Sequence, residues 1–395
     1  MACGRSGFSL TIPRAVGSVL TALFTACVPS AIERVPVPTT DRWRVLVAGD
    51  ETGTVSPEYP LDVTAEMVEY ARRVAGSGKS EDKLEALQEH LFDHARFPFE
   101  YSKNETYTAI EAFERRQGNC VSFTMLFIAL ARAVGVDASP ALLRSVEEKE
   151  QEGQLTIINK HVVAVHRQRN TVLIYDFAES REGTPAAMRV LEDNWITAMF
   201  LNNLGVQDLL EDRLERARER LEMAVAMAGD FAMVLNNLGV VYRRQGEHEK
   251  ALNAYVLARN GWGASAGNID NLRLVYQAQS GYEPGARLPA WEDLPADVTD
   301  AEMVRLGHAW MARGRTTRAM QMYDSAAELA PGSVQPVLAK ARVELYRRRP
   351  KAAIRSLSEA LSLESDHPDV EHLTAFLKLQ RTTASAAREV TLRPD

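Results

Sequence analysis

The residues with the clearest chemical potential are a cysteine, a histidine and an aspartate that follow one another in the order needed for thiol chemistry. Cys120 stands directly after Gly118-Asn119 and before the apolar run 121–134. A nucleophilic thiol needs a base within hydrogen-bond reach, a group that orients this base, and a donor for the developing oxyanion. We expect Cys120 at the N-terminus of a buried helix, where free N–H groups and the helix dipole favour the thiolate.

Two histidines, His161 and His166, are candidates for the base. Both lie in the predicted strand 155–168. They are five residues apart, so they face opposite sides of a strand and only one of them can face Cys120. His161 begins the apolar part of this segment, whereas His166 abuts the polar turn 167–169. We therefore predict that His161 is the base.

An acidic side chain should fix the tautomer of the imidazole. Asp176 lies in the predicted strand 171–178, where its neighbours are largely apolar. A lone charge in an apolar strand is costly unless it is paired, so Asp176 is predicted to have a partner. Glu179, just beyond it, is the alternative.

The two other cysteines lie in an N-terminal segment that differs from the rest of the chain. Residues 1–14 carry two arginines and no acid, and the next 12 residues, AVGSVLTALFTA, carry no charge. About 20 such residues are needed to span a bilayer, so 1–27 is predicted to be a cleaved export signal. An uncleaved anchor and a cytoplasmic protein are the alternatives.

The end of that segment, Leu23-Phe24-Thr25-Ala26-Cys27, resembles the lipobox of bacterial lipoproteins. The resemblance implies lipidation of Cys27, a Pro-rich tether over 28–40, and a membrane-anchored protein that faces the periplasm. Val28 is not the aspartate linked to inner-membrane retention, which favours the outer membrane. Cys120 would then be the only free thiol of the mature chain, either buried and inert or kept for chemistry.

The segments around these residues predict an α+β domain over 41–195. Four helices and three strands are expected. The helices are 62–76 with Thr64 as its N-cap, 80–95 with Ser80 as its N-cap, 108–118 ended by Gly118, and 121–134; the strands are 136–146, 155–168 and 171–178, with a hairpin tip at 147–154.

Beyond residue 195 the pattern becomes a repeat. LNNLG occurs at 201–205 and again at 235–239, an offset of 34 residues, and small and large residues recur at the same spacing further on. This period is typical of tetratricopeptide helix pairs. We predict an all-α solenoid over 196–385, interrupted at 282–299 by a Pro-rich insertion that breaks or bends the stack, and then a tail over 386–395.

Three segments around the cysteine, histidine and aspartate resemble the transglutaminase-like superfamily, which has a papain-like fold: 108–138, 159–165 and 175–178. The resemblance covers roughly residues 60–180, and the combination is similar to exported bacterial proteins that join this domain to tetratricopeptide repeats. It implies that Cys120 is the nucleophile, His161 the acid/base and Asp176 the orienting carboxylate. Tyr101 or Asn104 could supply an oxyanion donor, but the backbone N–H of Cys120 is the safer assignment.

Together these features predict a cell-envelope cysteine-dependent amide or peptide hydrolase, or an acyl transferase, that acts through a thioester on Cys120. The repeats would bind a protein substrate or partner. The alternative is a catalytically inactive scaffold for protein–protein interaction in the envelope. A third option is an enzyme of small acyl-amides whose repeats serve only for assembly.

Other function classes find little support in the sequence. The 395 residues are 46% hydrophobic and 25% charged, with a net charge of −7 and no long basic block, so no nucleic-acid partner is expected. His90 and His94 could bind a metal on one helix face, but they lack a third ligand, so neither a metal nor any other cofactor is expected. The oligomeric state is not indicated.

Overall fold

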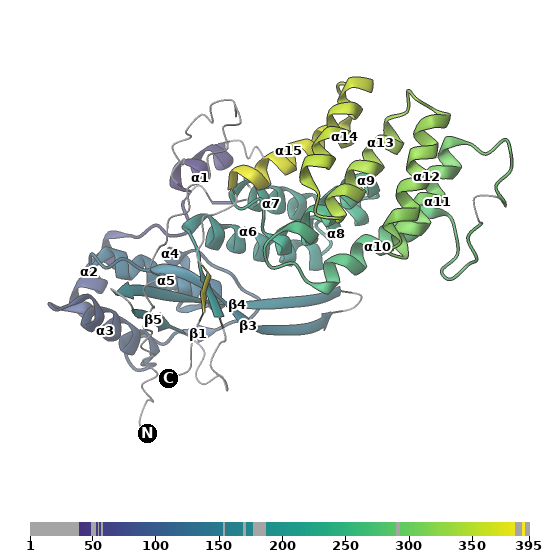
Figure 1. Cartoon of the computed structure of the whole chain (residues 1–395). Coiled ribbons are helices and arrows are strands. Elements are labelled where there is room, and N and C mark those ends of the chain that lie inside the picture. The colour runs from purple at the N-terminus through teal and green to yellow at the C-terminus, as the bar shows by residue number, and fades with distance from the viewer. Residues whose placement is uncertain are drawn as a thin grey trace, which may run out of the picture. The chain divides into compact units, whose positions relative to one another are not determined.

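The computed structural model describes residues 39–48, 53, 55–56, 58–152, 155–168, 171–176, 187–289, 293–383 and 389–391. The predicted export signal with Cys27 lies outside these residues, and so does Glu179. The chain forms two compact units, 1–196 with 386–395 and 197–385 (Figure 1).

The first unit begins with helices. Their bounds are α1 (Thr39–Ala48), α2 (Ala65–Ala75), α3 (Ser80–Phe92), α4 (Ala109–Arg115) and α5 (Cys120–Ala133). Thr64 is the N-cap of α2, as predicted, and its Oγ1 accepts a hydrogen bond from the Met67 N–H at 3.2 Å. The prediction that Ser80 caps α3 is wrong, because Lys79 is the N-cap and its N–H donates to Asp82.

The strands of this unit form two sheets. Their bounds are β1 (Glu100–Tyr101), β2 (Gln117–Gly118), β3 (Ser139–Glu152), β4 (Leu155–Gln168), β5 (Thr171–Tyr175), β6 (Ala187–Val190) and β7 (Glu389–Thr391). β1 and β2 form a short parallel pair, and the others form an antiparallel sheet in the order β5-β4-β3-β6-β7. β4 has the predicted bounds.

Two parts of this sheet differ from the sequence prediction. β3 continues to Glu152, so the segment 147–152 is paired strand and not a hairpin tip, because it forms an antiparallel ladder with β4. Residues 389–391, expected only as part of a tail, form β7 and pair with β6. The charged sequence of 147–152 hid its strand character, since it lacks the alternation of apolar and polar residues by which strands are predicted.

Helix α5 is buried on every side, as its composition predicts. All residues from Val121 to Ala131 are buried. Its contacts with the sheet include the Thr124 Oγ1, which donates to the Val162 carbonyl at 3.3 Å, and the Phe127 ring, which stacks on Tyr175 at 4.9 Å. This packing fixes the helix against β4 and β5, the strands that carry or precede the predicted histidine and aspartate.

The second unit consists of helices. Their bounds are α6 (Asp193–Leu210, which begins in the first unit), α7 (Leu214–Met227), α8 (Ala232–Arg244), α9 (His248–Asn260), α10 (Ala266–Ser280), α11 (Asp300–Ala312), α12 (Thr316–Leu329), α13 (Val334–Tyr346), α14 (Pro350–Leu363) and α15 (Pro368–Thr383). None of the helices in the described part of the chain is both long and apolar enough to cross a membrane.

The 34-residue period has a steric basis in this unit. A Cβ on Gly239 would lie 2.6 Å from the Tyr255 ring, and one on Gly307 would lie 2.3 Å from the Tyr323 ring. In both repeats the first helix therefore approaches the second so closely that only glycine fits opposite the tyrosine. The recurring small and large residues are thus an inter-helix packing code.

Helices that follow the insertion pack against a helix that precedes it. The Asn253 side-chain amide on α9 donates to the Asp369 carbonyl on α15 at 2.9 Å, and Arg342 Nε on α13 donates to Asn253 Oδ1 at 2.7 Å. The eight residues of α9 from Ala251 to Ala258 are all buried. Because α10 and α11 also pack together across it, the insertion does not break the stack.

Candidate functional site

Cys120 is the first residue of α5, and an asparagine holds the backbone that precedes it. Asn119 is the N-cap: its Oδ1 accepts hydrogen bonds from the N–H groups of Val121 at 3.0 Å and Ser122 at 3.1 Å. Its Nδ2 donates to Thr106 Oγ1 at 2.6 Å. Cys120 itself is a half-buried free thiol, so the thiol sits at a rigid helix start with access to solvent.

The chain enters this position through two unusual residues. The predicted helix end at Gly118 is wrong, because α4 ends at Arg115 and Arg116 adopts the left-handed conformation as its C-cap (φ 57°). Gly118 lies in β2 with φ 153°, and a Cβ there would lie 2.5 Å from the Ser122 Cβ. Its role is therefore to let the chain pass close to the first turn of α5.

His161 lies at an irregularity of the sheet. Leu142 of β3 pairs with Val162, but the next β3 pair is Glu147 with Lys160, so extra β3 residues stand opposite His161. Such bulges bend a strand and redirect side chains, and they are common beside active sites. We attribute the orientation of His161 toward the helix start to this irregularity.

The imidazole of His161 joins the other two predicted residues. Its Nε2 lies 2.6 Å from Asp176 Oδ1, and it also forms a side-chain hydrogen bond with Cys120. Because Nε2 faces the carboxylate, Nδ1 is left for the thiol. The His161 side chain is only 5% exposed, so water does not compete for these contacts.

Asp176 does not lie within a strand, as the sequence predicted, but follows β5 directly. The ladder with β4 ends at the pair Ala164–Tyr175, which leaves the next residue free to turn its carboxylate to His161. The Asp176 side chain is 27% exposed, so its burial cost is smaller than that of a charge inside the sheet.

The electrostatics of the trio favour a charged imidazole. Burial lowers the pKa of His161, but the hydrogen bonds with Asp176 and Cys120 and the charges of these groups raise it, with a net result of about 9. At neutral pH the imidazole is therefore protonated, and its two N–H groups donate to the carboxylate and to the sulfur. A protonated imidazole beside a cysteine is the arrangement in which thiol nucleophiles are activated.

The residues that the sequence offered as alternatives lie elsewhere. The Nδ1 of His166, which is also buried, lies 2.6 Å from the Asp137 carbonyl. Tyr101 is 53% exposed on β1, and Asn104 is exposed in the following turn. Within the described residues, no acceptor is found for the backbone N–H of Cys120. Its role as the oxyanion donor stays a prediction.

The histidine pair considered for a metal does not share a helix. α3 ends at Phe92, before His94, because the Asp93 side chain accepts a hydrogen bond from the Ala95 N–H and turns the chain. The Nδ1 of His90 lies 2.8 Å from the Tyr70 hydroxyl. Over the described part of the chain, no three histidine, cysteine or acidic side chains are grouped as metal ligands would be.

Sequence reasoning missed the role of Asn119, although the signal was present in an asparagine that directly precedes a helix. Replacing Asn119 by Ala should lower the free energy of unfolding by about 1–2 kcal/mol, because two N–H groups of α5 lose their acceptor. Urea denaturation measures this loss. Asn119→Ser, which can still cap, should lose less; equal losses in the two variants would refute the capping role.

Comparison with known families finds one matching segment in each of the two units. Residues 68–171 match the Transglutaminase-like superfamily and residues 211–265 match the Tetratricopeptide repeat family. The first match contains Cys120 and His161 and ends before Asp176. None of the curated proteins that were compared matches the chain.

Solved structures are similar to part of this chain. YrrB, described as a TPR protein, is 17% identical over 45% of this chain and 92% of YrrB, with a TM-score of 0.21. MamA is 17% identical over 42% of this chain and 78% of its own, with a TM-score of 0.20. The two family matches show a transglutaminase-like domain followed by tetratricopeptide repeats, a repeat type that generally mediates protein or peptide binding.

Proposed function

We propose that the first unit is a thiol-dependent amide or peptide hydrolase, or an acyl transferase, with Cys120 as nucleophile, His161 as acid/base and Asp176 as the orienting carboxylate. The observation that carries the proposal is the position of His161 between the other two, 2.6 Å from Asp176 and hydrogen-bonded to Cys120. An inert buried cysteine has no need of a protonated imidazole beside it.

In the proposed reaction the Cys120 thiolate attacks the carbonyl carbon of an amide. The oxyanion that forms accepts a hydrogen bond from the Cys120 backbone N–H, and His161 donates its proton to the leaving amine. A thioester remains. His161, now neutral, takes a proton from water or from a second amine, and attack by that nucleophile releases the acid or the new amide together with the thiol.

The test is the alkylation rate of Cys120 by iodoacetamide as a function of pH, measured by peptide mass spectrometry on the full chain so that the other cysteines do not interfere. In wild type the rate should change less than about twofold between pH 6.5 and 8, since His161 keeps its proton over this range. With His161→Gln it should rise about tenfold per pH unit, as for a free thiol with a pKa near 8.5.

The matched control is His166→Gln, which removes a buried imidazole from the same strand but leaves the contact with Asp176 intact. This variant should keep the flat profile. A wild-type profile that rises with pH and is indifferent to His161 would refute the enzymatic proposal, and the domain would then act as a scaffold.

The location and partners of the protein belong to the same proposal. We propose that the chain is exported to the cell envelope, is anchored by a lipid on Cys27 and binds a protein substrate or partner through its repeats. The lipobox-like sequence before Cys27 supports the anchor. Labelled fatty acid should be incorporated into the protein in cells and should disappear with Cys27→Ser; label retained in that variant would refute the anchor.

A further inference from the structure

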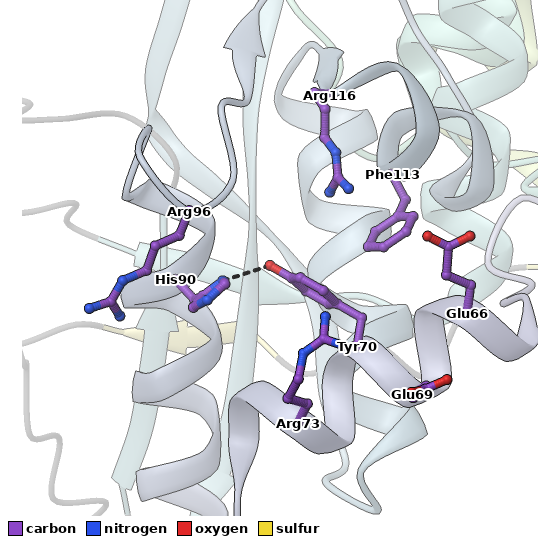
Figure 2. Close-up of a pocket in the computed structure, with 8 residues that line it drawn as sticks. All are labelled: Glu66, Glu69, Tyr70, Arg73, His90, Arg96, Phe113 and Arg116. Atoms are coloured by element: carbon purple, nitrogen blue, oxygen red, sulfur yellow. Dashed lines mark hydrogen bonds between the residues drawn. The ribbon is translucent and has the colours of Figure 1, made fainter.

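A second site of interest is a pocket of about 460 Å³ in the first unit, formed by side chains of α2, α3 and α4 and of the residues that follow α3 and α4. This volume is within the range of small-molecule sites. Its lining residues include Tyr70 and Phe113, which supply an aromatic surface, and Arg73, Arg96 and Arg116, which supply positive charge (Figure 2). None of these residues takes part in the contacts among Cys120, His161 and Asp176.

The backbone conformation of Arg116 indicates a functional role for its side chain. Its backbone is in the left-handed conformation, φ 57° and ψ 35°, at a C-cap position where glycine is usual. For a residue with a Cβ this costs about 1–2 kcal/mol. Strain of this kind is concentrated at functional sites, where the surroundings maintain it.

The guanidinium of Arg116 packs against two aromatic rings, but its hydrogen-bonding capacity is not fully used by the described residues. Its central carbon lies 3.7 Å from the Phe97 ring centroid and 4.4 Å from that of Phe113. Nη1 is buried and has no hydrogen-bond partner among the described residues, and no described carboxylate is within ion-pair distance. Burial accordingly lowers the pKa of Arg116, although Tyr70 and Glu66 oppose this effect. The planar group is pre-oriented, as bidentate oxyanion binding requires.

The other charges of the pocket narrow the class of ligand. In Figure 2 the guanidinium groups of Arg73 and Arg116 point toward the Tyr70 ring, while Glu66 and Glu69 lie on the other side of this ring from Arg96. Arg96 is already paired with Asp93 at 3.0 Å. Arg73 and Arg116 have no ion pair among the described residues. Together with the two carboxylates, they suit a small ligand with a single anionic group and repel a polyanion.

We propose that this pocket binds the oxyanion group, a carboxylate or a phosphate, of a small molecule whose apolar body lies on Tyr70 and Phe113, with Arg116 as the main contact. The inference does not depend on the reactivity of Cys120. It is tested with benzoate and inorganic phosphate as separate probes, and with benzamide as the uncharged counterpart of benzoate.

Binding is followed on the full chain by NMR, through the ring signals of Tyr70, which are assigned with Tyr70→Phe. Benzoate, phosphate or both should shift these signals saturably, and benzamide should not. Arg116→Asn should weaken the binding at least tenfold, because asparagine tolerates the left-handed backbone but lacks the charge. Arg115→Asn is the matched control: it removes a charge from the neighbouring exposed residue and should change the affinity less than twofold.

A thermal melt of each variant shows that it is folded before its affinity is compared. A saturable benzoate shift alone identifies a carboxylate ligand, and a phosphate shift alone identifies a phosphate ligand. The proposal is overturned if neither anion gives a saturable shift in wild type, if benzamide binds as well as benzoate, or if folded Arg116→Asn binds like Arg115→Asn.

Discussion

Replacing Asp176 by Asn should lower the pKa of His161 from about 9 toward its ordinary value of 6.5. The carboxylate supplies one of the hydrogen bonds and one of the charges that raise this pKa, while burial acts in the opposite direction. An amide of the same size keeps the shape but not the charge. Burial would then be opposed by Cys120 alone, and a larger share of the imidazole would be neutral at pH 7.5.

The stability of the protein should depend on pH through the protonation of His161. Because the pKa of His161 is higher in the folded state than the 6.5 of an unfolded chain, protonated His161 stabilises the fold fully below pH 6.5. This contribution is lost as the pH rises through about 9. The difference in unfolding free energy between wild type and Asp176→Asn should be on the order of 3 kcal/mol at pH 6 and should shrink markedly by pH 10.

The pKa is measured by NMR on the imidazole of His161, whose signal is identified by its absence in His161→Gln. Urea denaturation at a series of pH values gives the stability difference. In the His161→Gln background, Asp176→Asn should no longer produce this pH dependence. A His161 pKa that stays near 9 without the carboxylate would show that Asp176 does not hold the imidazole in its charged form.

The sequence was sufficient for the parts of this site that rest on composition and order. The wholly apolar run after Cys120 predicted a buried helix with the cysteine at its start, and α5 begins at that residue. The position of His161 in an apolar strand segment, against the polar end at His166, was also enough to choose between them. Both signals are local, because burial of a segment follows from its own side chains.

The sequence could not give the features that depend on pairing between distant segments. The irregularity opposite His161 arises from the register of β3 against β4, and the end of β5 at Tyr175 arises from the end of its ladder. The left-handed Arg116 could not be foreseen either, since a glycine two residues later was the obvious helix stop. In the repeats, the 34-residue period described neighbouring helices but not the return of α13 and α15 to α9.

The packing of α13 and α15 against α9 depends on Arg342. We therefore expect Arg342→Met to lower the stability of the second unit strongly. Arg342 is 1% exposed, pairs with Glu249 at 2.5 Å and donates to Asn253 at 2.7 Å. Burial raises the pKa of Glu249, but Arg342 outweighs this effect and lowers it to about 2. Without the arginine, the Glu249 carboxylate, 25% exposed, keeps a hydrogen bond from Gln279 but loses its ion pair, and the free energy of unfolding should fall by about 3 kcal/mol at pH 7.

The double variant Arg342→Met, Glu249→Leu distinguishes the contribution of the ion pair to stability from the contribution of side-chain packing. Replacing both partners by apolar residues removes the unpaired charge, so most of the lost stability should return. The matched control on the same helix is Lys340→Met, which breaks a more exposed pair with Asp324 at 2.9 Å and should cost at most about 1 kcal/mol. Urea denaturation followed by circular dichroism measures all three variants.

At low pH, the difference in unfolding free energy between Arg342→Met and wild type should become smaller. The depressed pKa of Glu249 contributes stability above pH 4.5 that is lost as the pH falls through about 2. In Arg342→Met the unpaired carboxylate can instead take up a proton and lose its burial penalty at low pH. A deficit that is as large at pH 3 as at pH 7 would mean that Arg342 acts through its volume, and that packing alone holds α13 against α9.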